Sequence, residues 1–239
     1  MFEPFESELF VAAMAPGLLV LDIGANIGYY TLLAAAGIGA SGRVLAFEPD
    51  EENFRVLCRN VAANSDSNVA PYRLAVSDSS DPVNLYLCEG NKGDHRTYEV
   101  PGRASVSVSC VMLDSFPDLM GCAPSVIKMD IQGAEMRALQ GMRGLASRSE
   151  AVALFTEYWP EGLSEAGTEA AEFVSLLTEL GFKLALIDEA SRSLRGVRTV
   201  EEIAAGLGPY GEANLLCTRG TWPSLDQFRE GTTSDCGHV

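Results

Sequence analysis

The chain has 239 residues, a formal net charge of −16 at pH 7 and a hydrophobic fraction of 47%. This length and apolar content fit one folded α/β domain and disfavour a largely disordered chain. The excess of acidic residues argues against nucleic acids and anionic lipids as partners, because both are bound by clustered Lys and Arg. The sequence has no apolar run of the roughly 18 residues that a membrane span needs, and acids follow Met1, so we expect a cytoplasmic protein without membrane insertion.

The six cysteines are scattered along the sequence. Neither a C-x-x-C pair nor a histidine-rich partner segment accompanies them, so their spacing does not indicate a zinc site. A chain with this much apolar sequence in a reducing compartment does not need disulfides. We therefore expect reduced thiols that lie mostly in the core.

The first part of the chain alternates short apolar runs with helical patterns. A glycine turn follows the first run and leads into an apolar stretch that we expect to be helical and to end at Gly37. Asp50, Glu51 and Glu52 then open a second helix, where acids suit the positive end of the helix dipole. The expected strands span 18–21, 44–47 and 69–74, and the expected helices span 27–36 and 51–63.

The pattern changes in the middle of the chain. Between residues 83 and 111, apolar and other residues alternate, which predicts an antiparallel excursion with a polar loop at 89–101. The alternation of strands and helices then resumes, and the last helix is expected to end at Gly181. The later strands are expected at 126–130, 152–157, 183–187 and 214–218, and the later helices at 135–145 and 168–180. This order predicts an α/β fold with a mainly parallel sheet, right-handed crossovers and helices on both faces.

A glycine turn with the sequence Asp22-Ile-Gly-Ala-Asn-Ile-Gly28 joins the first strand to its helix. Glycines there let a ligand approach the backbone, and the helix start offers N–H groups to an anion. A nucleoside triphosphate loop would end in Gly-Lys-Ser/Thr, whereas Tyr29 follows Gly28, and a dinucleotide fingerprint would have a third glycine. The observed spacing suits a ligand with a carboxylate, an amine and a ribose but no phosphate, and S-adenosylmethionine has those groups.

Carboxylates at two strand ends fit the same ligand. Glu48 ends the second strand, where open α/β sheets bind ligands, and a carboxylate is a natural acceptor for both hydroxyls of a ribose. Ser77 and Asp78 follow the third strand and are expected to meet the adenine amino group. The residues expected to bind the cofactor are Asp22, Gly24, Ala25, Asn26, Gly28, Glu48, Ser77 and Asp78.

Four segments resemble the FkbM-type methyltransferase family. They are Asp22-Ile-Gly-Ala-Asn-Ile-Gly-Tyr-Tyr-Thr-Leu-Leu, Ala46-Phe-Glu-Pro, Asn91-Lys-Gly-Asp-His-Arg-Thr-Tyr98 and Val126-Ile-Lys-Met-Asp-Ile-Gln-Gly-Ala-Glu135. The fourth is the most specific, but it has Gln132 where the family more often has Glu, so a role for that carboxylate is not carried over. The resemblance covers most of the chain. It implies a Rossmann-like class I methyltransferase fold, S-adenosylmethionine as cofactor with S-adenosylhomocysteine as product, and O-methylation of a hydroxyl on a sugar, lipid or natural product.

Two residues are candidates for proton removal during methyl transfer. A general base typically contributes about 10²–10⁴-fold to the rate. Asp130 ends the strand beside the cofactor strands and is expected to act as base or substrate anchor, although it also fits a cap for the following helix. His95 lies in the polar loop and has an ordinary pKa near 6.5, which suits proton removal, but a lone loop histidine also fits a solvent-exposed position.

Four further residues are expected to contact the acceptor, which the sequence predicts to be a small molecule or glycan. Two of them, Tyr158 and Trp159, also fit half-buried positions at the rim of the acceptor site. The carboxylates of Asp130, Glu135 and Glu157 could instead bind a divalent cation. We place this interpretation second because carboxylates at strand ends do not by themselves establish a coordination sphere. We therefore expect no metal. The four expected acceptor residues are Glu135, Glu157, Tyr158 and Trp159.

The ends of the chain and one late segment complete the predicted organisation. Phe5, Leu9 and Phe10 share a helical face, which is expected to cover the acceptor site or to pack against another subunit. The segment 188–213 shows little helical regularity and fits a lid or a surface excursion. The expected units are an N-terminal helical segment (1–17), a Rossmann-like methyltransferase domain (18–219) and a flexible tail (220–239).

Three other functions stay compatible with the sequence. An N-methyltransferase would need only a differently shaped acceptor pocket. A non-catalytic module would bind S-adenosylmethionine without forming S-adenosylhomocysteine. A nicotinamide-dependent oxidoreductase shares the architecture, but the missing third glycine opposes it.

Overall fold

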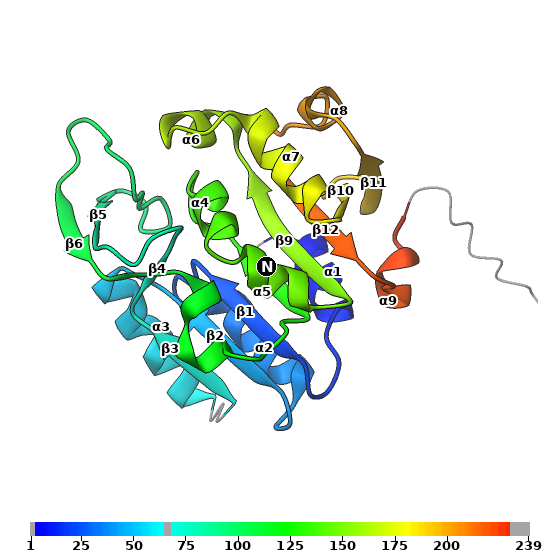
Figure 1. The fold of residues 1–239 in the computed structure, drawn as a ribbon, viewed down its shortest axis with the longest axis horizontal. Helices are drawn as coiled ribbons and strands as arrows, with labels where there is room; N and C mark the ends of the chain where they lie inside the picture. Colours follow the sequence, from blue (N-terminus) through cyan, green and yellow to red (C-terminus); the bar gives the residue numbers. More distant parts are fainter. Residues whose placement is uncertain (1–2, 65–67, 230–239) are drawn as a thin grey trace, which may run out of the picture.

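The computed structural model of the chain describes residues 3–64 and 68–229. An eight-stranded sheet lies at its centre (Figure 1). From one edge to the other, its strands are β11 (Ser193–Val197), β10 (Lys183–Asp188), β12 (Ala213–Arg219), β9 (Val152–Tyr158), β8 (Val126–Met129), β1 (Leu19–Ile23), β2 (Arg43–Phe47) and β3 (Val69–Tyr72). The pairs from β9 through to β3 are parallel, whereas β12 is antiparallel to β9 and β10, and β11 is antiparallel to β10. The predicted α/β fold with a mainly parallel sheet is confirmed.

Helices cover both faces of the sheet (Figure 1). Val20 and Val44 pack on one face with Ala34, and Leu21 and Leu45 pack on the other, because side chains alternate along a strand. The first face carries α1 (Pro4–Ala12), α2 (Tyr29–Ile38), α3 (Glu51–Ala63) and α9 (Pro223–Asp226). The second face carries α4 (Glu135–Gln140), α5 (Arg143–Arg148), α6 (Pro160–Glu165), α7 (Ala170–Glu179) and α8 (Val200–Ala204), with short 3₁₀ turns at Leu113–Ser115 and Pro117–Leu119.

Helix α3 has the predicted bounds, and its start is fixed by a side chain. Asp50 is the N-cap, and its carboxylate accepts hydrogen bonds from the backbone N–H groups of Glu52 and Asn53 at 3.0 and 2.8 Å. Such a cap stabilises a helix by about 1 kcal/mol. Leu57 of α3 packs against Ala46 of β2. The cap therefore fixes where the chain turns after Glu48, which is a candidate site residue.

Two predicted helix boundaries are wrong because glycines serve close packing there. Helix α2 continues past Gly37 to Ile38, and Gly39 with φ 63° ends it. A Cβ on Gly37 would lie 2.6 Å from the Cβ of Met14. The single helix predicted over 135–145 is divided into α4 and α5 at Gly141, where a Cβ would lie 1.9 Å from the carbonyl oxygen of Ser77.

The N-terminal helix α1 packs inside the chain. The predicted shared face of Phe5, Leu9 and Phe10 is confirmed, and all three side chains are buried. The ring of Phe10 lies 5.0 Å from that of Tyr30 and 5.4 Å from that of Phe155, measured between centroids. This face is therefore occupied by the chain's own core and does not serve to bind another subunit.

The predicted antiparallel excursion is confirmed. Strands β5 (Val83–Tyr86) and β6 (Ser105–Val108) pair antiparallel and stand off from the main sheet (Figure 1). Below them, β4 (Ala75–Val76) pairs in parallel with β7 (Cys110–Val111). The polar loop at 89–101 lies between β5 and β6.

The segment at 188–213 is more regular than the sequence predicts. It contributes the edge strand β11 and the short helix α8, in which Ile203 is buried. Its apolar residues are too few to show a period, because only one side of an edge strand and of a short helix packs against the core. The sequence therefore gave no signal for either element.

The C-terminal tail and the cysteines are partly described. Residues 223–226 form α9, whose Leu225 is buried, and the predicted tail beyond residue 229 lies outside the described residues. The cysteines of the described part are free thiols, and Cys236 lies outside it. Within residues 3–64 and 68–229, no helix combines the length and apolar character needed to cross a membrane.

Candidate active site

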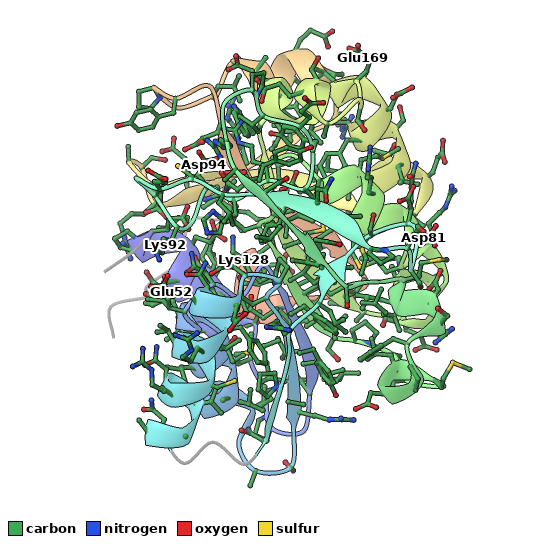
Figure 2. The ribbon with its side chains drawn as sticks, turned by 90° about the vertical axis from the view of Figure 1, so that its left-hand side faces the viewer. Glu52, Asp81, Lys92, Asp94, Lys128 and Glu169 are labelled. Carbon is green, nitrogen blue, oxygen red and sulfur yellow. The ribbon has the colours of Figure 1, made fainter. Side chains whose placement is uncertain are left out.

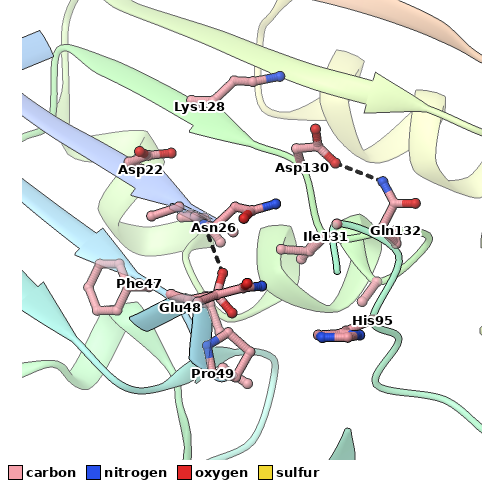
Figure 3. A pocket seen from close by; sticks show the side chains of 18 of the residues that line it. Asp22, Asn26, Phe47, Glu48, Pro49, His95, Lys128, Asp130, Ile131 and Gln132 are labelled. Atoms are coloured by element: carbon pink, nitrogen blue, oxygen red, sulfur yellow. Dashed lines mark hydrogen bonds between the residues drawn. The ribbon is translucent and has the colours of Figure 1, made fainter. Parts of the chain in front are cut away.

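A cavity of about 550 Å³ opens where the parallel strands β1, β2, β8 and β9 end (Figure 3). Residues that line it include the glycine turn after β1, the end of β2, the loop at 91–97, and the ends of β8 and β9. The structure thereby brings together most of the residues predicted to form the site. The predicted residues that line the cavity are Asp22, Gly24, Ala25, Asn26, Glu48, His95, Asp130 and Glu157.

The glycine turn is compact because Gly24 has no side chain. Gly24 has φ 84°, and a Cβ there would lie 2.0 Å from the carbonyl oxygen of Asp130. The N–H groups of Gly24 and Ala25 donate to the carbonyl of Phe47, and that of Gly28 donates to Ala25. These N–H groups are used within the protein, so a ligand in the cavity meets chiefly the side chains around the turn.

Asp22 is a buried carboxylate in the cavity wall. Its Oδ2 accepts a hydrogen bond from the hydroxyl of Thr31 on α2 at 2.5 Å. Burial raises the pKa of Asp22 to about 6, since water is removed from its charged form. Asp22 is therefore still mostly ionised at pH 7 and can attract a positively charged group.

Glu48 is held rigidly at the end of β2. Its two oxygens accept hydrogen bonds from the backbone N–H groups of Asn26 at 2.8 Å and Asp50 at 2.9 Å. Burial outweighs these bonds and raises the pKa of Glu48 to about 7. Each carboxylate oxygen can accept further hydrogen bonds, so Glu48 presents a fixed double acceptor to the cavity.

The loop at 89–101 closes one side of the cavity. The amide of Asn53 donates to the carbonyl of Lys92 at 2.9 Å, and Figure 2 shows Lys92 beside Glu52 of α3, with which it forms an ion pair. Asp94 forms ion pairs with Arg96 and Arg103, which hold the pKa of Asp94 below its usual value. The loop is therefore held in place by contacts with α3 and by the ion pairs of Asp94.

His95 points into the cavity from this loop, but with its donor side free. The Nδ1 atom accepts a hydrogen bond from the backbone N–H of Cys88 at 3.0 Å, and Nε2 lies 4.0 Å from Oδ2 of Asp50. Burial lowers the pKa of His95, so the ring is neutral at pH 7. In a neutral ring whose Nδ1 accepts, Nε2 carries the proton. In this state Nε2 of His95 is a hydrogen-bond donor.

Asp130 and Glu157 face the other end of the cavity and are bridged by an amide. The Nε2 atom of Gln132 donates to Oδ1 of Asp130 at 2.9 Å, drawn as a dashed line in Figure 3, and to Oε2 of Glu157 at 3.3 Å. Gln132 has φ 54°, which is unusual for a residue other than glycine and fits a constrained site. Burial, with Asp130 and Glu135 nearby, raises the pKa of Glu157 to about 10, so this side chain is protonated at pH 7.

The sequence interpretation missed a buried ion pair at the same end. The Nζ atom of Lys128 lies 2.9 Å from Oε1 of Glu6 on α1, and these side chains are only 2% and 0% exposed. The ammonium also lies 4.9 Å from the centroid of the Tyr30 ring. The available signal was a lysine inside the buried run Val-Ile-Lys-Met, where a strand covered on both faces should carry apolar residues.

Other missed residues come from distant parts of the sequence. Glu3 lines the cavity and accepts hydrogen bonds from the Tyr30 hydroxyl at 3.1 Å and from the Asn214 amide at 2.6 Å. Glu212, from the loop before β12, lines it as well. No motif surrounds either glutamate, so the sequence does not single them out, although the segments that carry them, 2–14 and 188–213, are ones from which it predicts acceptor contacts.

Several predicted site residues do not line the cavity. Ser77 donates to Asp78 at 3.0 Å behind the wall that Val76 forms, and Gly28 forms the N-cap of α2. Tyr158 is buried in the core with Leu163 and Phe173, so the predicted contact of Tyr158 with an acceptor is not seen.

Two further predicted acceptor residues have partners within the protein. Trp159 stacks against Arg96 at 4.5 Å, measured from the guanidinium carbon to the ring centroid. Glu135 accepts a hydrogen bond from the backbone N–H of Ile131 at 3.0 Å. Among the residues that the structure describes, no group of three or more His, Cys, Asp and Glu is arranged to hold a metal ion.

The fold is shared with solved methyltransferases. A methyltransferase FkbM from Methylobacillus flagellatus KT is similar with a TM-score of 0.50 and 17% identity, over 87% of this chain and 47% of that chain. A methyltransferase-like protein from Streptococcus mutans, solved in complex with S-adenosylhomocysteine, is similar with a TM-score of 0.54 and 10% identity, over 91% of this chain and 97% of that chain. The chain therefore has the Rossmann-like class I methyltransferase fold.

The sequence comparison gives the family. The model of the methyltransferase FkbM domain matches residues 22–184, and the chain belongs to this family. An arsenite methyltransferase from Halobacterium salinarum is 33% identical over 138 residues, which are 52% of this chain and 35% of that protein. The hexuronic acid methyltransferase AglP from Haloferax volcanii is 26% identical over 122 residues, or 51% of this chain and 48% of that protein. The matches thus span half or less of these curated relatives.

Proposed function

We propose that this chain binds S-adenosylmethionine in the cavity and methylates a hydroxyl oxygen of a small-molecule or glycan acceptor, such as a sugar, a lipid or a natural product. The observation that carries this proposal is the carboxylate of Glu48, which two backbone N–H groups fix beside the glycine turn. A fixed carboxylate can accept hydrogen bonds from both hydroxyls of a ribose. The cofactor supplies a methyl group on a sulfonium and leaves as S-adenosylhomocysteine.

The cavity walls fit the other parts of this cofactor. Gly24 lets the turn pack directly against the backbone of Asp130, so the turn and the end of β8 lie together in the wall of the cavity. The carboxylate of Asp22 faces the same space and suits the ammonium of the methionine part. Phe47, Val76 and Leu85 form an apolar wall, where we place the adenine ring. Ser77 and Asp78 would then support this wall from behind.

Asp130 is the proposed general base. Gln132 donates to Oδ1 of Asp130, which leaves Oδ2 available for the proton of an acceptor hydroxyl. His95 is oriented as a donor, and Glu157 is protonated at pH 7, so neither competes for this role. The residues of this end orient the hydroxyl toward the methyl group, and such positioning can lower a barrier by about 7–11 kcal/mol.

The relatives favour a hydroxyl-bearing acceptor over an arsenic one. AglP acts on a hexuronic acid, by its name, and a sugar presents hydroxyl groups of the kind that Asp130 could deprotonate. The arsenic of arsenite is a soft acceptor that thiolate ligands bind well. No cysteine is among the described residues that line the cavity. We therefore place a sugar-like acceptor first.

The test is a transfer assay with the purified chain. S-adenosylmethionine is incubated with the chain and a panel of neutral sugars, uronic acids, amino sugars, lipid alcohols and arsenite, and S-adenosylhomocysteine is measured by mass spectrometry. We expect its release to depend on a hydroxyl-bearing acceptor, with an O-methyl product. Binding of the cofactor without release in any mixture would show a non-catalytic module, and an N-methylated product would contradict the oxygen acceptor.

A further inference from the structure

The buried ammonium of Lys128 has fewer partners than it has donors. An ammonium carries three N–H groups. The ion pair with Oε1 of Glu6, at 2.9 Å, is the one polar partner within bonding distance that the described residues give it, and Nζ has no hydrogen bond in addition. Water cannot compensate from outside, because the side chain is 2% exposed. Lys128 therefore keeps N–H groups that need an acceptor.

Stability alone does not explain this pair. Taking two charges out of water is costly, and apolar residues of similar volume often serve a fold equally well or better. Lys128 occupies a strand that is otherwise apolar, Val126–Met129, and all four side chains of β8 are buried. A charge at this position points to a ligand, since Lys128 is also one of the residues that line the cavity.

Lys128 and Asp130 border the same part of the cavity. They are two residues apart at the end of β8, so their side chains leave the strand on the same side, and both line the cavity. Figure 3 shows the Lys128 ammonium and the Asp130 carboxylate on the same side of the space above Asn26. A hydroxyl group that lies between them could accept a hydrogen bond from Lys128 and donate one to Asp130.

We propose that Lys128 is a catalytic residue whose ammonium donates a hydrogen bond to the oxygen that is methylated, and that Glu6 is the positioning residue that holds it there. The inference rests on the proposed function and names the acceptor atom. The hydroxyl proton passes to Asp130, the oxygen lone pair forms the new O–C bond, and the C–S bond breaks with its electron pair left on sulfur. Lys128 keeps its proton throughout. The ammonium stabilises the negative charge that develops on a deprotonating hydroxyl and disfavours the positive charge that develops on an amine during methylation, so the site favours oxygen over nitrogen.

The carboxylates around Lys128 explain why it can hold this role over a wide pH range. The negative charges of Glu6 and Asp130 raise the pKa of Lys128 above its ordinary value, despite the cost of burial. The ammonium is therefore a permanent donor. Glu6 belongs to α1, so the N-terminal helix contributes to the chemistry through this contact and not only through packing.

The first test reads Lys128 directly by NMR. The sequence has three lysines, Lys92, Lys128 and Lys183, so a spectrum of the chain with ¹³Cε-labelled lysine has three signals that single Lys→Arg variants assign. The probe is glycerol, which is small enough to enter the cavity, added in the presence of S-adenosylhomocysteine. We expect the Lys128 signal to move and the signals of Lys92 and Lys183 to stay. A Lys128 signal that does not respond overturns the inference.

The second test measures catalysis with matched variants. Lys128→Met removes the hydrogen-bond donor. The double variant Glu6→Gln with Lys128→Met removes both charges, so that no buried charge is left without a partner. Lys183→Met, at an exposed position of β10, is the control. Loss of one such donor typically costs about 10²–10³ in kcat. We expect a loss of this size for methyl transfer to glycerol in both Lys128 variants, with the affinity for S-adenosylmethionine changed less than about twofold. Equal rates, or no transfer by the wild type, overturn the inference.

Glu6→Gln tests the positioning role. Without its partner carboxylate, the Lys128 signal should titrate at a lower pH than in the wild type, because burial then opposes the charged form without compensation. A purely structural role of Glu6 would lower the melting temperature and leave this titration unchanged. Failure of the wild type to bind S-adenosylmethionine would overturn the proposed function itself, whereas binding without a response at Lys128 overturns this inference alone.

Discussion

The two ends of the cavity are built in different ways. The end that we propose for the cofactor is local: the seven-residue segment from Asp22 to Gly28 and the carboxylate of Glu48 lie within one strand, helix and strand unit. The acceptor end gathers Glu3, Lys128, Glu157 and Glu212, which lie far apart in the sequence. The first end depends on backbone shape, and the second depends on buried charges that neighbours from α1, β8 and β9 compensate. The difference predicts that substitutions at the two ends fail in different ways.

The largest effect is expected at the acceptor end. Asp130→Asn keeps the size of the side chain and its contact with Gln132 but removes the proton acceptor. We expect kcat to fall by about 10²–10⁴-fold, while the dissociation constant for S-adenosylmethionine stays within about threefold. Steady-state kinetics and calorimetry check the two values. A variant with wild-type kcat would remove Asp130 from the mechanism.

A backbone effect of nearly the same size is expected at the cofactor end. Gly24→Ala places a Cβ 2.0 Å from the carbonyl oxygen of Asp130 at φ 84°, so it should lower the free energy of unfolding by about 2–4 kcal/mol. Gly39→Ala is the matched control, because Gly39 also has a positive φ of 63° but no atom lies within 4 Å of its Cβ position. The control should lose about 1 kcal/mol. Equal losses in urea unfolding would refute the close contact.

The substitution Glu157→Gln is expected to raise the free energy of unfolding at neutral pH, whereas Gly24→Ala lowers it. The pKa of Glu157 is raised from 4.5 to about 10, so the folded chain keeps a proton that the unfolded chain releases, and stability falls as the pH rises through this range. Glu157→Gln removes this linkage. We expect the variant to match the wild type near pH 4 and to exceed it near pH 8 by up to about 5 kcal/mol, since each pH unit above 4.5 adds about 1.4 kcal/mol. Thermal unfolding of both proteins at the two pH values measures this difference in stability. A difference that is the same at both pH values would show that Glu157 is not protonated in the folded chain.

The smallest effect is expected at His95. Because its Nδ1 accepts from Cys88 and its pKa is lowered, His95 is a neutral donor and not a base. His95→Gln keeps an amide donor and should change kcat by less than about threefold, without moving the pH profile of kcat. A loss of about 10²-fold together with a moved profile would return His95 to the role of base.

The sequence predicted the cofactor end better than the acceptor end for a physical reason. The strand order, the glycine turn and Glu48 follow from short patterns, because a positive φ at Gly24 and a carboxylate after β2 leave local marks. Ser77, Tyr158 and Trp159 were expected at the cavity and lie outside its walls, since a strand end fixes a residue's position but not the direction of its side chain.

The acceptor end leaves few local marks. Lys128 has one, a charge within an apolar strand, but its partner Glu6 lies on α1 and could not be paired with it from the sequence. Gln132 was seen only as a departure from the family pattern, and its bridge between Asp130 and Glu157 is a property of the fold. Residues that meet only through tertiary packing are thus the part of the site that sequence patterns miss.

The central claim is that the cavity binds an adenosyl cofactor through Glu48. The most direct measurement is calorimetric titration of the wild type and the isosteric Glu48→Gln variant with S-adenosylhomocysteine and, separately, with NAD, at pH 6 and pH 8. Since the pKa of Glu48 is about 7, the account predicts that wild-type affinity for S-adenosylhomocysteine rises from pH 6 to pH 8, that the variant binds it about 10-fold more weakly at pH 8, and that NAD does not bind. Binding of NAD alone, or a Glu48→Gln variant with unchanged affinity, would contradict the account.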